Sequence, residues 1–138
     1  MVKSIRKTRA GVSRQGRKQR LVVSKAKLHV RQNLMHSPLN KTLRSKYSRR
    51  AVQVRKGDTV RVMRGQFKKK EGKVERVDLK RGKIYVVGVE ITKQDASKVL
   101  YPLHPSNVRI ELLDVADAKR KVMLARTSNE LEKLSKNN

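Results

Sequence analysis

The chain has 138 residues, of which 37 are Lys or Arg and 11 are Asp or Glu, so its formal net charge is +26. It contains no cysteine, which excludes a disulfide scaffold, thiol catalysis and a Cys-based zinc site. Apolar residues make up 36% of the chain and aromatic residues 3%, so we expect one domain with a small core. Such a dense positive charge favours a polyanionic partner, and nucleic acid is the usual one.

The positive charge is concentrated at the N-terminal end. Residues 1–56 contain 18 Lys or Arg and no acidic residue, whereas residues 57–113 contain 13 basic and 7 acidic residues. This asymmetry predicts four regions: a basic arm over 1–25 that is disordered without RNA, a basic helical segment over 26–50, a barrel over 51–113, and a C-terminal helix and tail over 114–138. A solvated tail or a mitochondrial presequence is the alternative interpretation of the arm.

Two short helices are predicted ahead of the barrel. Ser24 is expected to cap a helix over Lys25–Met35 that has only a narrow apolar stripe. Ser37 and Pro38 have the residue types typical of an N-cap and a first helical position, and they predict a second helix that ends near Tyr47.

From Ala51 onward the apolar residues alternate with a period of two, which predicts strands. We expect five of them, at Thr59–Met63, Val74–Leu79, Lys83–Val87, Ile91 with Val99–Leu103, and Val108–Leu112. A small barrel suits them better than an open sheet, because closure removes unpaired strand edges. A final helix is predicted over Asp117–Arg126 with Asp114 or Asp117 as its N-cap, followed by a weaker helix start at Asn129 and a frayed end at residues 136–138.

The segment Arg64–Lys70 is predicted to be a basic loop between two strands. It combines four basic side chains with Phe67, and this is the composition of a phosphate-binding patch with one aromatic ring for stacking. A solvated hairpin with Phe67 folded inward is an equal alternative. Gly65 and Gly72 stand where a tight hairpin needs a positive φ or a close backbone approach.

These residues resemble the KOW motif of ribosomal and transcription-elongation proteins. Three further stretches extend the resemblance to the archaeal and eukaryotic large-subunit ribosomal protein family that is number twenty-four in the universal naming: Leu34–Tyr47, Val77–Val86 and His104–Val108. Together they cover about residues 26–125. The turn at Arg81–Lys83 has no insertion and is more similar to archaeal members. Family members commonly have Gly at the position of Lys69, so we expect a looser or differently shaped turn here.

The resemblance implies a mainly β fold: a small SH3-like β-barrel with an N-terminal basic extension carrying short helices and a C-terminal helix. It also implies a structural role in the large ribosomal subunit, with binding to 23S-type ribosomal RNA, early assembly and a position near the polypeptide exit tunnel. The implied location is cytoplasmic, and the implied partners are this RNA and neighbouring ribosomal proteins. We expect no cofactor, membrane, small-molecule substrate or self-association.

The candidate RNA-binding residues are the basic side chains of the arm, the helical segment and the loop, together with Phe67. They are Arg14, Arg17, Lys18, Arg20, Lys25, Lys27, Arg31, Arg44, Lys46, Arg49, Arg50, Arg64, Phe67, Lys68, Lys69 and Lys70. Four residues are expected to shape turns: Gly57, Gly65, Gly72 and Pro105. With only four aromatic residues, recognition should rest on phosphate charge and RNA shape.

Other classes of function fit less well. The histidines, His29, His36 and His104, lack nearby acidic or cysteine partners, so no metal site is expected, and His104 is predicted to fix the turn at Pro105. No catalytic triad, carboxylate pair or phosphate-cradling Gly loop has supporting context, so we expect no enzyme. The alternatives are a KOW-type transcription-elongation module and a DNA-packaging architectural protein.

Overall fold

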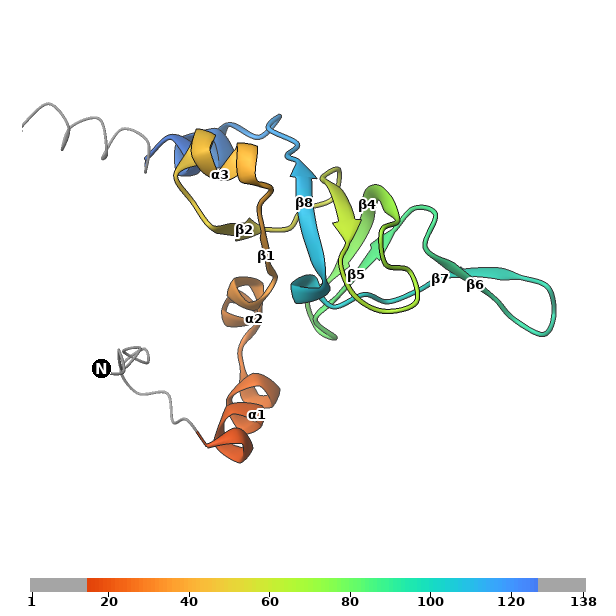
Figure 1. Cartoon of the computed structure of the whole chain (residues 1–138). Helices are drawn as coiled ribbons and strands as arrows, with labels where there is room; N and C mark the ends of the chain where they lie inside the picture. The colour runs from red at the N-terminus through yellow and green to blue at the C-terminus, as the bar shows by residue number, and fades with distance from the viewer. Residues whose placement is uncertain (1–14, 127–138) are drawn as a thin grey trace, which may run out of the picture.

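The structure is a computed structural model, and it describes residues 15–126 (Figure 1). Three helices and eight strands follow one another with a short 3₁₀ helix, and residues 118–126 are also helical. Their bounds are α1 Gly16–Lys25, α2 Leu28–Leu34, β1 His36–Pro38, α3 Lys41–Tyr47, β2 Ala51–Gln53, β3 Thr59–Val62, β4 Glu71–Asp78, β5 Lys83–Val86, β6 Glu90–Thr92, β7 Lys98–Leu100, η1 Pro105–Asn107 and β8 Val108–Leu112.

All strand pairs are antiparallel. A four-stranded sheet has the order β5-β4-β3-β8, and two further strand pairs are present: β1-β2, whose strands are connected through α3, and the hairpin β6-β7. The fold is therefore mixed α/β with antiparallel sheets, and the prediction of a mainly β chain underestimated its helices. In the described residues the ladders do not join into a continuous ring.

Both outer edges of the four-stranded sheet are nevertheless partly covered. On β8, Ile110 forms an isolated parallel bridge with Leu39, and the Asn40 N–H donates to the Ile110 carbonyl at 2.9 Å. On β5, Ile84 and Leu103 exchange two backbone hydrogen bonds of 2.9 Å. The sheet thus curls around its inner face, and these contacts occupy part of the edge that another chain could pair with.

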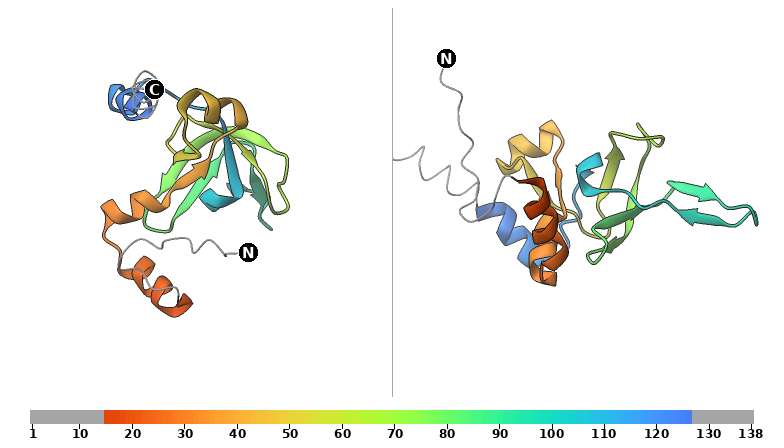
Figure 2. Two further views of the ribbon diagram at one scale, coloured as in Figure 1. Left: turned by 60° about the vertical axis from the view of Figure 1, so that its left-hand side comes forward. Right: turned by 90° about the horizontal axis from the view of Figure 1, so that it is seen from below.

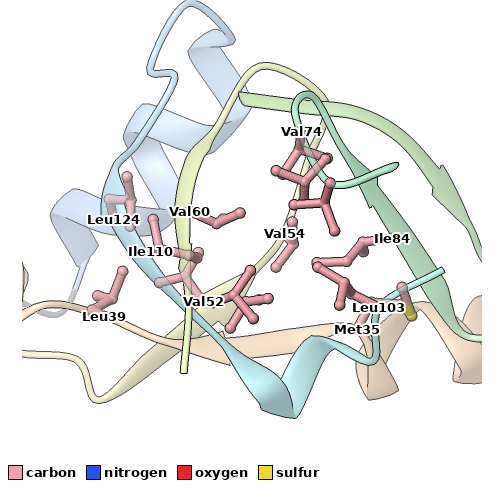
Figure 3. Close-up of a cluster of buried hydrophobic side chains, with 14 residues drawn as sticks. Met35, Leu39, Val52, Val54, Val60, Val74, Ile84, Leu103, Ile110 and Leu124 are labelled. Carbon is pink, nitrogen blue, oxygen red and sulfur yellow. The ribbon is translucent and has the colours of Figure 1, made fainter. Parts of the chain in front are cut away.

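The inner face of the sheet encloses an aliphatic core. Figure 3 shows side chains from the strands, from the segment before α3 and from the C-terminal helix converging on one space. The buried cluster consists of Met35, Leu39, Val52, Val54, Val60, Val62, Val74, Ile84, Val86, Val89, Leu103, Val108, Ile110 and Leu124. Most of these residues are β-branched, and β-branched side chains pack well on a pleated surface.

The predicted strands agree with the structure where alternation was clear. β3, β5 and β8 lie within one residue of their predicted bounds. The segment expected to be a fourth strand is instead a separate hairpin, β6-β7, which projects from the body in Figure 1 and in the right view of Figure 2. Strands β1 and β2 were not predicted.

The predicted helix starts at Ser24 and Ser37 were wrong. Ser24 lies inside α1, where its hydroxyl donates to the Leu21 carbonyl, so it caps nothing. Ser37 is fully buried in β1 and its hydroxyl donates to the Pro105 carbonyl at 2.6 Å. Helix α3 begins at Lys41, with Asn40 as its N-cap. The Ser37 hydroxyl therefore connects β1 to η1 and does not cap a helix.

Residues 118–126 form the C-terminal helix at nearly the predicted bounds. The Asp117 carboxylate accepts a hydrogen bond from the Lys119 N–H at 2.9 Å, as an N-cap does. It is also paired with Arg55, and this hydrogen bond, together with that from Lys119, lowers the pKa of Asp117 below its usual value. The predicted helix start at Asn129 and the frayed end at residues 136–138 lie outside the described residues.

A buried ion pair anchors this C-terminal helix to the sheet. The Arg120 guanidinium is 1% exposed and donates to both carboxylate oxygens of Asp58, at 2.6 and 2.8 Å. It also donates to the carbonyls of Asp114 and Gln53, while Asp58 accepts from the N–H groups of Arg55 and Asp114. The pair thus ties the turn before β3 to the chain after β8. The sequence did not single it out, because its partners are 62 residues apart.

Candidate nucleic-acid interface

The predicted RNA-binding side chains are spread over three parts of the structure. The first group lies on α1, on α2 and at their junction, a second group lies on and after α3, and the third occupies the loop between β3 and β4. Arg14 lies outside the described residues. Every other basic member of the set is exposed except Arg31 and Arg49, which are partly buried.

Helix α1 buries none of its residues against the body of the protein, which consists of residues 35–126. None of its ten residues is buried, and it stands clear of the sheet in Figure 1 and in the left view of Figure 2. Arg17, Lys18 and Arg20 therefore lie on an exposed helix where the sequence predicted a segment without regular structure. A ten-residue helix that buries none of its residues is marginal in water by itself, because most helical stability in proteins comes from tertiary packing.

Arg31 has a structural position in addition to its charge. Its guanidinium donates to the carbonyls of Ala26, Ser24 and Lys80 at 2.9, 2.8 and 2.6 Å. Three of its five N–H donors are therefore used to fasten the junction between α1 and α2 to the turn between β4 and β5. This use of its donors makes Arg31 a residue that positions the arm.

The second group surrounds the C-terminal end of α3. Ser48 ends this helix in the left-handed conformation, with φ 50°, and Arg49 and Arg50 follow it. Arg44 donates one hydrogen bond to the Leu39 carbonyl, and the Lys46 ammonium lies 5.5 Å from the centre of the Tyr47 ring. Cations near a helix C-terminus also interact favourably with its dipole. These charges therefore stabilise α3 and remain available to bind a ligand.

The β3–β4 loop, Arg64–Lys70, is held by its own backbone. Lys68 N–H donates to the Gly65 carbonyl, Lys70 N–H to the Phe67 carbonyl, and Lys69 N–H to the Val62 carbonyl, at 2.9–3.1 Å. All four basic side chains of the loop are exposed. The loop thus presents a fixed cluster of positive charge, as a phosphate-binding surface requires.

Lys69 lies in the left-handed region, with φ 75°. A side chain with a Cβ atom is unfavourable there, and this explains physically why a glycine suits the position. The turn keeps this backbone conformation with a lysine, so the loop is strained at Lys69, where the sequence predicted a looser or differently shaped turn. Gly65, with φ 90°, has the conformation predicted for it.

Phe67 is turned toward the body. It is partly buried against the core cluster, with its ring centre 5.2 Å from that of Tyr101 and the Lys70 ammonium 5.3 Å from its own centre. Of the two predicted arrangements, the inward one is present. Phe67 therefore fixes the loop on the body and presents little ring surface for stacking on a base.

The other predicted turn residues have distinct structural reasons. Gly72 lies inside β4, where a Cβ atom would collide with the carbonyl oxygen of Val87. Gly57 has φ 96° and a Cβ atom there would meet the Asp114 carboxylate. Pro105 is buried at the start of η1, and His104 caps that helix by accepting from the Ser106 N–H, as predicted for the turn.

Four acidic side chains of the described residues form ion pairs with basic residues outside the predicted RNA-binding set. The described ion pairs are Arg55–Asp117, Arg61–Glu71, Arg109–Glu111 and Arg120–Asp58. Within residues 15–126, none of these pairs includes a basic residue of the β3–β4 loop, or Arg44 or Lys46. The positive charge on these surfaces is therefore not neutralised by the described part of the fold, and a phosphate backbone would neutralise it.

Sequence reasoning missed the basic residues of the β4–β5 hairpin. Arg76, Lys80 and Arg81 are exposed, and together with Tyr85 and Leu28 they line an open hollow of about 610 Å³. The basic turn Lys80-Arg81-Gly82 is the sequence feature that indicates these residues, and above it serves only as part of the family resemblance.

Within residues 15–126 no group of three or more His, Asp or Glu side chains is arranged to hold a metal ion. Over the same residues, none of the helices has both the length and the apolar character needed to cross a bilayer.

Exposed, unneutralised cations on a small antiparallel scaffold are typical of proteins that contact the phosphate backbone of nucleic acid. Comparison with known protein families then gives the assignment. Residues 13–127 match the family of ribosomal proteins that comprises protein L26 of eukaryotes and its archaeal counterpart, protein L24. The chain belongs to this family of large-subunit ribosomal proteins. Its role is accordingly structural, it is not an enzyme, and its family implies ribosomal RNA and other ribosomal proteins as partners.

Proposed function

We propose that the protein binds 23S-type RNA of the large ribosomal subunit early in assembly, near the polypeptide exit tunnel of cytoplasmic ribosomes. The observation that carries the proposal is the set of exposed basic side chains on α1, after α3 and in the β3–β4 loop, within a chain of its family. The family supports the subunit, and the unneutralised charge supports direct contact with the RNA backbone.

The curled sheet is proposed to be the SH3-like barrel of the KOW fold. Its support is the coverage of both sheet edges, through the Leu39–Ile110 and Ile84–Leu103 bridges. This arrangement holds the β3–β4 loop rigidly, so that Arg64, Lys68 and Lys70 meet phosphates without a large ordering cost.

The arm has a complementary role. Residues 1–25 are proposed to order along RNA, bringing Arg17, Lys18 and Arg20 against phosphates between RNA helices. Because α1 has no buried side chain, contacts with RNA would supply the stabilisation that the body does not provide. The protein would then join RNA segments that are distant in sequence.

Co-sedimentation tests this function. The tagged protein is expressed in cells and the lysate is separated on a sucrose gradient, with chromosomal DNA collected in parallel. We expect the protein in large-subunit and assembly-intermediate fractions, where crosslinking should join variants carrying a photoreactive residue at Arg17, Arg49 or Lys69 to ribosomal RNA. Recovery with DNA or RNA polymerase, and none in ribosomal fractions, would contradict the proposal.

A further inference from the structure

The two turns that flank β4 lie at opposite ends of this strand. β4 spans the eight residues Glu71–Asp78, and at about 3.3 Å per residue its length is roughly 25 Å. The β3–β4 loop adjoins its first residue, and the hollow lined by Arg76, Lys80 and Arg81 lies at its other end. One phosphate group cannot be shared across that distance, so the hollow is a separate basic surface.

The hollow contains a stacked cation–aromatic pair. The Arg76 guanidinium carbon lies 4.3 Å from the centre of the Tyr85 ring, and Tyr85 is only 8% exposed. Arg76 therefore covers the ring, while its own side chain is exposed to the hollow. A guanidinium plane is a surface on which an unpaired RNA base stacks, and the ring behind it holds that plane in place.

Lys80 and Arg81 supply positive charge next to this pair. In the described residues neither side chain has an ion pair with a carboxylate. Asp78, in the same turn, accepts a hydrogen bond from the Arg81 N–H at 3.0 Å and thereby shapes the turn. A lysine and an arginine head group beside a stacking surface match the phosphates that flank an unpaired base.

The backbone of this turn is held by a hydrogen bond that does not involve the Lys80 or Arg81 side chains. The Lys80 carbonyl accepts from Arg31 at 2.6 Å, which ties the turn to the junction of α1 and α2. Leu28, at the start of α2, also lines the hollow. Residues of the β4–β5 hairpin and of α2 thus form the site together, and its volume of about 610 Å³ lies in the range of sites that accept small-molecule-sized groups such as a nucleotide.

We propose that this hollow binds an unpaired nucleotide of RNA, with the base stacked on Arg76 and the flanking phosphates on Lys80 and Arg81. The inference rests on the proposed function, because it takes RNA as the ligand. It adds a second contact on the body, at the far end of β4 from the loop. Contacts with RNA at both ends of β4 would fix the angle between two RNA segments.

The test measures binding of the full-length protein to protein-free large-subunit RNA at several salt concentrations. Lys80→Gln/Arg81→Gln removes two charges from the hollow and leaves the backbone bonds of the turn intact. We expect at least about a tenfold loss of affinity and a log–log salt slope shallower by about 1.5. The matched control, Lys93→Gln/Lys98→Gln on the β6-β7 hairpin, removes the same charge and should stay within about twofold of the wild type.

A second variant separates stacking from charge. Arg76→Lys keeps the positive charge and loses the planar guanidinium, so affinity should fall several-fold to about tenfold while the salt slope stays unchanged. Thermal unfolding confirms that each variant is folded.

The outcomes are distinguishable. If the hollow variants match the Lys93/Lys98 control while Lys68→Gln/Lys70→Gln weakens binding, the hollow is not an RNA site and the proposed function stands. If the wild-type protein itself does not bind the RNA, the proposed function fails. If the hollow variants lose affinity for duplex DNA and for ribosomal RNA equally, the site is a general phosphate-binding surface, and binding of an unpaired nucleotide is contradicted.

Discussion

Helix α1 exposes every one of its ten residues, whereas the sheet and the C-terminal helix enclose a shared core of fourteen side chains. Both regions carry many positive charges, but the fold fixes these charges to different degrees. In the body, backbone hydrogen bonds and packing fix the loop that bears Arg64 and Lys68. On α1 no packing fixes Arg17 or Arg20. The body therefore presents a preformed surface, whereas we expect the arm to gain order from its ligand.

The largest effect should come from breaking the buried ion pair of the body. Asp58→Ala leaves the Arg120 guanidinium buried without its carboxylate and frees the N–H groups of Arg55 and Asp114. We expect the free energy of unfolding to fall by about 3–5 kcal/mol, measured by urea denaturation. Leu21→Ala on α1 is the contrasting variant and should change it by less than about 0.5 kcal/mol, since Leu21 is half exposed.

A companion variant sharpens this result. Asp58→Leu/Arg120→Met replaces both partners of the ion pair by apolar side chains, so no charge is left buried. It should recover most of the loss seen in Asp58→Ala, because uncompensated burial of Arg120 is the main cause. Equal losses in both variants would show instead that the hydrogen bonds that Asp58 accepts from the backbone N–H groups of Arg55 and Asp114 dominate.

Removing charge from α1 should change binding and leave stability unaffected. Arg17→Gln/Lys18→Gln/Arg20→Gln removes three charges from a helix that buries nothing. The log–log salt slope for binding to ribosomal RNA should become shallower by about 2–3, while the thermal midpoint stays constant. Fluorescence anisotropy at several salt concentrations measures the slope. An unchanged slope would mean that the arm does not contact phosphates.

The strained loop predicts a smaller effect of opposite sign. Lys69→Gly relieves the left-handed φ of 75° and should raise the free energy of unfolding by about 1 kcal/mol. Lys68→Gly removes the same charge at a position without positive φ, so it should lower stability by roughly 0.5–1 kcal/mol. Urea denaturation of both variants makes the comparison. A loss of stability in Lys69→Gly would show that the lysine side chain contributes more than the backbone strain costs.

The smallest effect concerns the start of the C-terminal helix. Arg55→Gln removes the main hydrogen bond that lowers the pKa of Asp117, so this pKa should rise toward its ordinary value of 3.8. A carboxyl group with a lowered pKa in the folded state stabilises that state at higher pH, and this contribution is lost as the pH falls through the folded-state pKa. NMR titration of the Asp117 side chain measures the change, and an unmoved pKa would assign the shift to the Lys119 N–H.

The strands of the body could be predicted where one face is buried. In β8 the residues Val108 and Ile110 are buried and Arg109 lies between them, so alternation alone located this strand. The segment 36–38 could not be located in this way. Its Ser-Pro pair has the local signature of a helix start, but the hydroxyl of Ser37 bonds to Pro105, which is 68 residues away. Local patterns carry no information about such a partner.

The positive charge of the candidate site could be predicted from the sequence, but the contacts that position its side chains could not. The exposed cations of the β3–β4 loop follow from composition, since nearly every residue there is polar. The structural roles of Arg31 and Arg120 do not follow from composition, because the sequence does not distinguish a buried or carbonyl-bound arginine from a surface arginine. The hollow at Arg76 depends on Tyr85 from the neighbouring strand, and only the register of β4 against β5 places the two side by side.

The central claim is that the protein binds ribosomal RNA by neutralising many phosphates at once. The most direct measurement is the salt dependence of the affinity of the full-length protein for protein-free large-subunit RNA. If about ten phosphates are contacted, the log–log slope should be about −7 to −9. A slope shallower than about −3 would contradict the claim, because so few released counterions could not account for the contacts assigned to the arm, the α3 end and the loop.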